Sequence, residues 1–399
     1  MTEPLSIGVG LISVGWMGQL HSRAYRALPL VYPELGVRPH LVRAADTAPA
    51  GRELAREVLG YAATSADYRE VLADPAVDVV SICAPNFLHA EVGIAAAEAG
   101  KPFWIEKPVG RSAAETSALR DAAMSAGVVT AIGFNYRQAP AVQVARRLIA
   151  DGRIGAITNV RGRMFGGFNA DPAAPRAWRF VRELSGSGVL GDLMGHLVDL
   201  VHHILGPIGS VTASTGTYIP RRPGSPGSVD EGGRLLPVEN EDYANMLIRF
   251  DDTALAAGAL GTLDASWIAV GPKAEYAIEI FGTEGSLRWD FERMNELELA
   301  THGPDGVGYT RLFADETFPE YARFQPGSGT PMGYDDLKTI EAQKFLRAVL
   351  DPSASPDALG ANIHDALAAA QVLTAAEESA ATGRWVAVPV APGHTGRTR

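Results

Sequence analysis

The stretch LSIGVGLISVGWMG, residues 5–18, decides the fold. Its first part is a run of apolar residues and glycines that predicts a β-strand over 5–13, and the apolar spacing of a helix follows over 17–28. A glycine-rich turn between a strand and a helix presents backbone N–H groups and a helix N-terminus to a pyrophosphate. The stretch therefore predicts the first unit of a dinucleotide-binding domain.

The turn keeps two of the three usual glycines. Gly15 stands where the backbone must approach the phosphates, and Gly18 stands where helix and strand pack closely, while Ser13 replaces the first glycine. We predict Ser13, Gly15, Trp16, Met17 and Gly18 as cofactor residues. A plain tight turn would fit the same letters, and Trp16 could pack instead of shielding the cofactor.

Asp46 ends the second predicted strand, where a carboxylate can accept hydrogen bonds from the adenosine ribose and would repel a 2'-phosphate. This favours NAD over NADP, although Arg43 and Arg52 leave NADP open. Asp46 lies further from Gly18 than the usual spacing of about twenty residues, which we attribute to an inserted loop over 29–39. Asp46 could instead be a capping neighbour of the next helix.

Strand and helix patterns alternate through the first third of the chain, which predicts a parallel, doubly wound α/β sheet. The expected strands after the first are 41–45, 79–83, 102–105 and 128–133, and the expected helices are 49–59, 88–99 and 113–126. This organisation is typical of a Rossmann domain, which we place at residues 1–134.

The chain changes character after residue 135, where we predict an α+β domain over 135–399 with a large, mostly antiparallel sheet. After a helix at 140–150, the expected strands are 157–165, 210–218, 243–250, 254–268, 274–281 and 285–290. The Pro- and Gly-rich segment 220–237 predicts a surface loop or a lid, and 391–399 predicts a frayed tail.

Composition narrows the class of partner. The 399 residues suit two domains, and a net charge of −11 disfavours nucleic acid or an anionic membrane as the partner. Cys83, the single cysteine, lies in an apolar run and reads as a buried structural thiol. No signal peptide or membrane span is recognisable, so we expect a cytoplasmic protein that acts on a small molecule.

Five short motifs occur in an order that resembles the glucose-fructose oxidoreductase, inositol dehydrogenase and rhizopine-catabolism family (Gfo/Idh/MocA). They are SVGWMG at 13–18, APNFLH at 84–89, EKP at 106–108, GFNYR at 133–137 and DLMGHLVD at 192–199. The resemblance covers nearly the whole chain and extends to FGTEGSL at 281–287. It implies a nicotinamide-dependent oxidoreductase that acts on a secondary alcohol or ketone of a sugar, glycoside or cyclitol.

Lys107 follows a strand and precedes a proline, so its backbone should be extended at the carboxyl end of the sheet, where ligands of such folds bind. Asp192 and His196 are four residues apart, which places them on one face of a helix. By resemblance, His196 is the general base, Asp192 orients it, and Lys107 polarises the reacting oxygen. The resemblance also implies a cis peptide before Pro108.

The resemblance assigns further site residues. It implies cofactor contacts for Pro85, Asn86, His89, Glu106, Lys107 and Asn135, and substrate contacts for Lys107, Arg137, Asp192 and His196, to which we add Arg179 as part of the pocket wall. For several of these a turn, capping or surface role is the alternative. Met194 stands where the family has glycine, with Gly195 one place later, which puts the shape of the substrate in doubt.

Alternatives remain at the level of function. His196, Asp199 and His203 have a spacing that could suit a metal, although no further ligand lies nearby and we expect none. Reduction of another carbonyl or imine, such as a dihydrodiol, biliverdin or amino-sugar precursor, is one rival, and a non-catalytic cofactor-binding protein is another. The resemblance also implies a homodimer or homotetramer that packs through the second-domain sheet.

Overall fold

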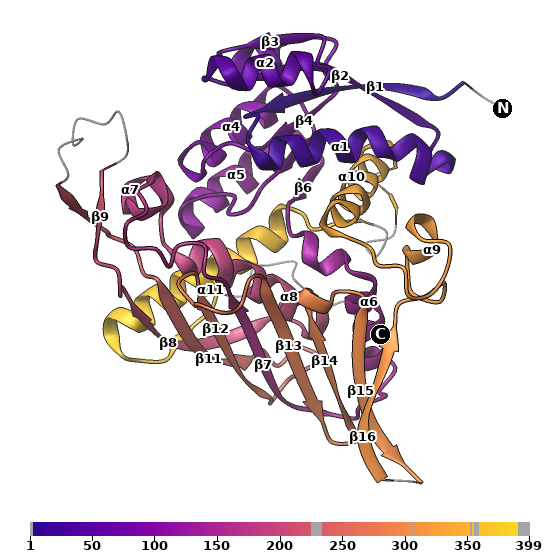
Figure 1. Ribbon diagram of the computed structural model, residues 1–399, viewed down its shortest axis with the longest axis vertical. Coiled ribbons are helices and arrows are strands. Elements are labelled where there is room, and N and C mark those ends of the chain that lie inside the picture. Colours follow the sequence, from indigo (N-terminus) through magenta and orange to yellow (C-terminus); the bar gives the residue numbers. More distant parts are fainter. Residues whose placement is uncertain (1–2, 225–233, 305, 352, 355–358, 390–399) are drawn as a thin grey trace.

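The computed structural model describes residues 3–224, 234–304, 306–351, 353–354 and 359–389, which form two units around two sheets (Figure 1). The first sheet is parallel and has the order β3-β2-β1-β4-β5-β6. Its strands are β1 (Leu5–Ile12), β2 (Val37–Ala45), β3 (Ala63–Ser65), β4 (Val79–Ile82), β5 (Phe103–Ile105) and β6 (Thr130–Ile132). The predicted doubly wound sheet is confirmed.

The helices between these strands are α1 (Trp16–Val31), α2 (Pro49–Glu57), α3 (Arg69–Ala73), α4 (Asn86–Glu98) and α5 (Ala113–Ala126). The inserted loop that we predicted over 29–39 is wrong. Helix α1 continues through Pro29, a 3-10 turn covers Pro33–Leu35, and Pro39 already pairs with Ile7 in the ladder. Pro39 is tolerated because β3 pairs only with Arg43–Ala45, so β2 is an edge strand at that point.

The second sheet has nine strands in the order β16-β15-β14-β13-β7-β12-β11-β8-β17 and is mostly antiparallel, with β7 and β12 parallel. Its strands are β7 (Ile157–Phe165), β8 (Ile208–Gly216), β11 (Tyr243–Phe250), β12 (Leu260–Ser266), β13 (Glu275–Gly282), β14 (Gly285–Asp290), β15 (Glu296–Gly303), β16 (Gly306–Phe313) and β17 (Val386–Ala387). The strand predicted over 254–268 is shorter, because turns that include Gly258 at φ +82° occupy 254–259.

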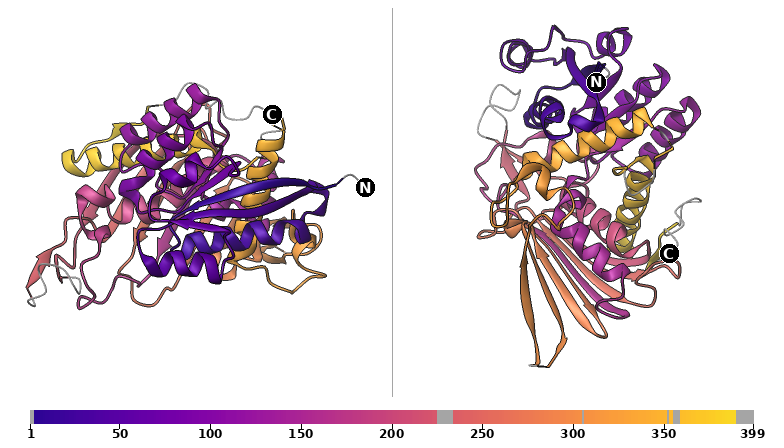
Figure 2. Two further views of the ribbon diagram at one scale, coloured as in Figure 1. Left: turned by 90° about the horizontal axis from the view of Figure 1, so that it is seen from above. Right: turned by 90° about the vertical axis from the view of Figure 1, so that its right-hand side faces the viewer.

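Helices α6 (Pro140–Ala150), α8 (Gly195–Leu205) and α11 (Ile363–Thr382) cover one face of this sheet, and the right-hand view of Figure 2 shows them gathered on that side. The hairpin of β15 and β16, helix α10 (Tyr334–Leu350) and helix α11 were not predicted. Helix α10 packs on α1, and α11 packs on both α5 and β8. The chain's last helices therefore join the second unit to the first.

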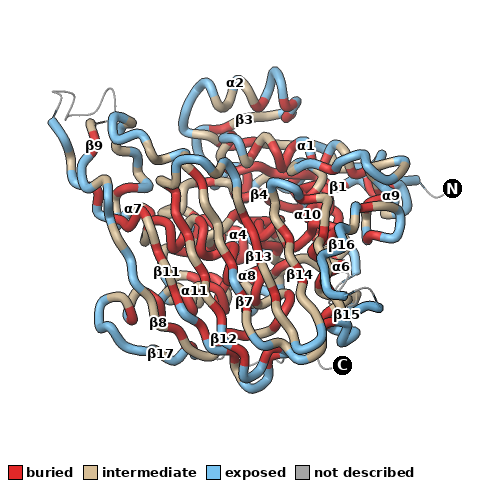
Figure 3. The backbone as a smooth tube through the Cα atoms, turned by 60° about the horizontal axis from the view of Figure 1, so that its bottom comes forward, coloured by how far each residue is buried: buried red, intermediate tan, exposed pale blue. Residues whose placement is uncertain are grey.

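In the second sheet burial alternates along strands such as β11 and β12, which Figure 3 shows as red segments between paler ones. Strands β4 and β5 of the parallel sheet are buried throughout. One apolar cluster is continuous across both units, since it includes Ile105 and Leu119 of the first and Leu193 and Leu263 of the second. The predicted tail over 391–399 and the centre of the predicted loop over 220–237 lie outside the described residues. The described ends of that loop pair as β9 (Arg221–Pro223) and β10 (Leu235–Pro237).

Candidate active site

The glycine-rich turn has the backbone that its residues predict. Gly15 caps α1, and a side chain at Gly15 would meet no protein atom within 4 Å. A Cβ at Gly18 would lie 2.3 Å from the carbonyl oxygen of Ser13, so close packing requires glycine there, as predicted. Ser13 has φ +72°, a conformation that favours glycine and costs a serine energy.

The Asp46 carboxylate supports this turn. Its Oδ2 accepts a hydrogen bond from the Val14 N–H at 2.8 Å, and its Oδ1 accepts one from the Ala48 N–H at 2.8 Å, just before α2. Arg43 is bound to Asp74 and Glu70. Arg52 donates to two backbone carbonyls, those of Asp46 and Thr47.

The segment after β4 starts α4 at the same edge of the parallel sheet. Pro85 caps the helix, and Asn86 donates from Nδ2 to the Ser185 carbonyl at 3.4 Å. The buried His89 ring donates from Nδ1 to the Pro108 carbonyl at 2.6 Å, and burial lowers the pKa of His89. Its Nε2 therefore carries a lone pair, and no hydrogen-bond partner for it occurs among the described residues.

Lys107 lies directly after β5, and its peptide bond to Pro108 is cis, as the resemblance implies. The Lys107 ammonium donates to the Asp192 carbonyl oxygen at 2.8 Å and to Asp192 Oδ1 at 2.9 Å. The carboxyl edge of the parallel sheet thus meets the start of α8, and Lys107 and Asp192 are brought together across the two units.

Asp192 lies in a π-helical turn, Leu190–Met194, which leads into α8. Such wide turns often occur at functional sites. The Asp192 carboxylate contacts Lys107 and lies 3.9 Å from the guanidinium of Arg179. Burial works against its ionised form, but Lys107 and Arg179 hold the pKa of Asp192 below its usual value. Its charge is therefore kept at neutral pH.

His196 begins the second turn of this helical segment and is surrounded by aromatic rings. Phe134 and Tyr136 meet its ring edge to face, and the Tyr276 hydroxyl donates to the His196 carbonyl oxygen at 2.5 Å. Burial, and then the Lys107 ammonium, hold the pKa of His196 well below its usual value. The imidazole is therefore neutral at physiological pH and has a nitrogen free to accept a proton.

The side chain of Asp192, which we predicted to orient His196, accepts a hydrogen bond from Lys107. The π turn is wider than an α-helical turn, so four residues of separation do not align the two side chains as they would on a regular helix. Asp192 acts on the His196 ring through charge instead.

Two residues assigned by resemblance bind other buried side chains. Glu106 binds Lys338 and His21, and Arg137 forms a buried ion pair with Asp199. Burial, opposed by Arg137, raises the pKa of Asp199 to about 7. The cofactor and substrate contacts assigned to Glu106 and Arg137 stay predictions.

The remaining predicted residues range from fully buried to exposed. The Asn135 side chain is fully buried, and its Oδ1 accepts from the Tyr334 hydroxyl at 3.4 Å. Trp16 is 62% exposed and stacks on Tyr334 with 5.5 Å between ring centres. Arg179 lies over the Trp178 ring and is half exposed.

Sequence reasoning missed the aromatic residues that connect Trp16 to His196. Tyr334 and Phe291 both contact Tyr136, which contacts His196. Tyr136 lies inside the GFNYR motif and could have been found there, whereas Tyr334 opens a helix that we did not predict.

Met194 and Gly195, where the chain departs from the family's glycine position, lie in different surroundings. Met194 is fully buried in the core that both units share, and a Cβ at Gly195 would meet only the tip of Leu373 at 3.6 Å. Among the described residues, no group of three or more His, Cys, Asp or Glu side chains could hold a metal ion. In the same part of the chain, no helix is long and apolar enough to span a bilayer.

Comparisons with known proteins agree with this geometry. Residues 7–134 match the model of an oxidoreductase family with an NAD-binding Rossmann fold, and residues 142–288 match the GFO/IDH/MocA C-terminal domain. Levoglucosan dehydrogenase of Pseudarthrobacter phenanthrenivorans is 36% identical, with 96% of this chain and 98% of that protein covered. Inositol 2-dehydrogenase of Rhizobium meliloti is 27% identical over 87% of this chain and 98% of its own length.

A solved structure of levoglucosan dehydrogenase with NADH and levoglucosan superimposes with a TM-score of 0.89 at 35% identity, with 96% of this chain and 100% of that chain covered. The matched models cover most of the parallel sheet and the second sheet from β7 to β13, and they contain four of the five motifs whole. The chain therefore belongs to the Gfo/Idh/MocA family and is an NAD-binding oxidoreductase related to sugar and cyclitol dehydrogenases.

Proposed function

We propose that this enzyme oxidises a ring secondary alcohol of a pyranose to a ketone. The observation that carries the proposal is the convergence of Lys107, Asp192 and His196 at the sheet edge that also carries the glycine-rich turn. NAD, when bound, accepts the hydride from the carbinol carbon. The hydroxyl proton goes to His196, and the C–O bond becomes the carbonyl.

The protein groups divide this work. The neutral His196 ring accepts the proton. The Lys107 ammonium, held by Asp192, donates to the reacting oxygen and stabilises its developing negative charge. We propose that Arg179, which is half exposed and lies 3.9 Å from Asp192, contacts other hydroxyls of the sugar.

Levoglucosan is the first substrate to test, because the relative that covers nearly the whole chain is named for it. Cyclitols and pentoses follow, since the more distant relatives include inositol and D-xylose dehydrogenases. The test mixes the enzyme and NAD with levoglucosan, myo-inositol and D-xylose and follows the absorbance of reduced nicotinamide. Turnover with at least one of these substrates is expected, and a flat trace with all of them, in both directions, rejects the proposal.

We propose NAD rather than NADP as the working cofactor. The Asp46 carboxylate supports the turn and would repel a 2'-phosphate, while Arg43 and Arg52 are engaged elsewhere. A higher kcat/KM with NAD than with NADP is expected, and the reverse order would reject this assignment. We also propose a cytoplasmic location, where the reduced nicotinamide cofactor can be reoxidised and used again.

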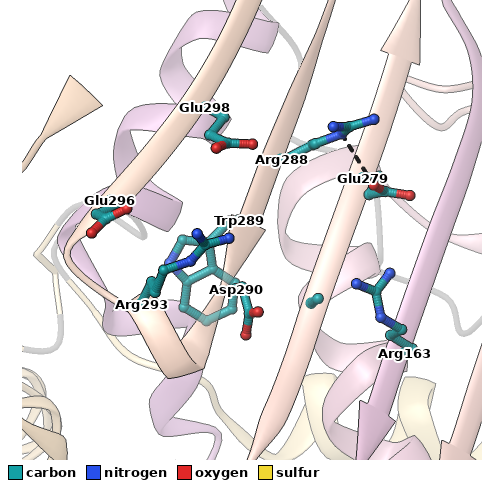
Figure 4. A pocket seen from close by; sticks show the side chains of 9 residues that line it. Arg163, Glu279, Arg288, Trp289, Asp290, Arg293, Glu296 and Glu298 are labelled. Carbon is teal, nitrogen blue, oxygen red and sulfur yellow. Dashed lines mark ion pairs between the residues drawn. The ribbon is translucent and has the colours of Figure 1, made fainter. Parts of the chain in front are cut away.

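We propose that the uncovered face of the second sheet binds another copy of the chain, as a homodimer or homotetramer. Figure 4 shows arginines and glutamates interleaved on this face, with Arg288 paired to Glu279. These charged side chains line a hollow of about 200 Å³. Exposed Leu247 and Leu260 lie on neighbouring strands of it. Alternating charges and apolar side chains suit a self-complementary contact.

Light scattering coupled to gel filtration tests this assembly. A dimer or larger species is expected, and Leu260→Glu should shift it toward the monomer. A monomeric wild-type protein at micromolar concentration would refute the proposal.

We further propose residues 1–134 and 135–399 as the cofactor and substrate domains.

A further inference from the structure

A charged cluster lies buried between the two units, next to the active site. The Lys338 side chain is 0% exposed, and its Nζ lies 2.6 Å from Glu106 Oε1 and 2.9 Å from Glu341 Oε2. His21 approaches the same Glu106 oxygen through Nε2 at 3.0 Å. The proposed mechanism uses none of these side chains directly.

The surroundings of the cluster are apolar. Helix α10 packs against α1 through Ala342, Phe345 and Leu346, and the indole of Trp104 lies under both the His21 ring and the Lys338 ammonium. A well-packed apolar residue in place of a buried ion pair is often neutral or stabilising. Stability alone therefore does not account for a lysine at this position.

At pH 7 two of the four groups are charged and two are mostly neutral. Lys338 keeps the pKa of Glu106 far below its usual value despite burial, and Glu106 keeps the pKa of Lys338 high, so both are charged. Burial lowers the pKa of His21 to about 4 and raises that of Glu341 to about 8, so both are mostly neutral at pH 7. The buried charge pair is Lys338 with Glu106.

Glu106 connects this pair to catalysis because it is the residue before Lys107. Its N–H donates to the Ile82 carbonyl in the sheet, and its carboxylate fits against Gly133, where a Cβ would lie 2.5 Å from the oxygens. Glu106 is therefore held at both its backbone and its side chain. The next residue along the chain places its ammonium on Asp192.

We infer that Lys338 is a positioning residue for the reaction: by holding the Glu106 carboxylate, it fixes the peptide that carries Lys107 and keeps the Lys107 ammonium on Asp192. Lys338 acts through Glu106, because its ammonium is fully buried against that carboxylate and over the Trp104 ring. Helix α10 of the second unit thus helps to set the geometry of a catalytic group of the first.

The test compares Lys338→Met with Glu341→Gln as the matched control. Glu341 contacts the same ammonium through Oε2 at 2.9 Å, but it stands three residues from Lys338 on α10 and not beside Lys107 in the chain, so its loss should leave Lys107 in place. The first readout is the rate of reductive methylation of Lys107, followed by mass spectrometry. This readout needs no substrate, so it decides the inference even if no sugar is oxidised.

In Lys338→Met, Lys107 should be methylated faster, and kcat should fall by about 10- to 100-fold, because a displacement of about 1 Å can cost that much. Affinity for NADH, measured by fluorescence titration, should change little. Unchanged methylation and kcat in Lys338→Met, or equal changes in Glu341→Gln, would overturn the inference.

A second variant covers the case in which Lys338→Met does not fold. Glu106→Gln removes a negative charge that raises the pKa of Glu341, so Glu341 can ionise as the counter-ion of Lys338 and the protein should fold. The variant still weakens the hold on the segment that carries Lys107. Faster methylation of Lys107 is expected in it. A folded Glu106→Gln protein with wild-type methylation of Lys107 would overturn the inference as well.

Discussion

Replacing Lys107 with methionine removes one positive charge that we expect to have two effects, one on the reacting oxygen and one on the pKa of His196. The ammonium donates to Asp192 Oδ1 at 2.9 Å and is the second-largest cause, after burial, of the low pKa of His196. Loss of a donor that stabilises a developing oxyanion costs about 2.7–4 kcal/mol, or about 10²- to 10³-fold in kcat. We therefore expect Lys107→Met to lose that much turnover.

The pH dependence should change in a definite direction. A depressed pKa keeps His196 neutral, and so able to accept a proton, well below pH 6.5. Without the Lys107 charge the pKa of His196 rises, so the acid limb of kcat/KM should move to higher pH. The burial of the ring remains, so the acid limb should stay below the ordinary pKa of histidine.

The assay follows NAD reduction from pH 4 upward with the best substrate of the panel. Lys273→Met is the matched control, since Lys273 is exposed and lies in the loop before β13. It should leave both kcat and the pH profile unchanged. A Lys107→Met enzyme with wild-type turnover, or with an acid limb displaced to lower pH, would refute the reasoning.

Three further outcomes can be measured on the purified protein. Ser13→Gly should raise Tm by about 1–2 °C, because it removes the strain of a serine at φ +72°; a lower Tm would contradict this. Gly18→Ala should destabilise the protein by about 1–3 kcal/mol in urea, since its Cβ meets the Ser13 carbonyl at 2.3 Å, whereas Gly15→Ala should leave stability unchanged and weaken NADH binding. Unfolding free energy should fall as pH drops from 6.5 to 4, by up to about 3 kcal/mol from His21, because the unfolded state binds the extra proton; His21→Gln should flatten that fall, and an unaltered pH dependence would count against it.

Local rules predict the first unit well because its elements carry their own signals. Helix α5 begins and ends where expected, with Ser112 accepting from the Glu115 N–H at its start and Gly127 at φ +64° at its end. Strands β7, β11 and β14 also match, since alternation marks a sheet with one uncovered face.

The parts that escaped prediction depend on contacts that are distant in sequence. Lys338 on α10 reads as a solvent-facing charge, yet it is buried against Glu106, which lies 232 residues earlier. The partner of Asp192 was likewise assigned from helical spacing, whereas a π turn, for which the sequence offers no signature, directs its carboxylate to Lys107. Motif order predicted the candidate catalytic groups, and only the fold shows which of them contact one another.

On the proposed mechanism, two cations face each other during the reaction. One is the Lys107 ammonium. The other is His196, which gains a proton as the alcohol is oxidised, a step that its low pKa in the free enzyme disfavours. The conflict is relieved when the substrate oxygen, placed between them, carries partial negative charge. The negative charge on the substrate oxygen develops in the transition state and is absent from the bound alcohol. Lys107 and His196 therefore stabilise the transition state more than the bound alcohol. The low pKa of His196 thus belongs to catalysis, and the fixed charge of Asp192 keeps Lys107 in position for it.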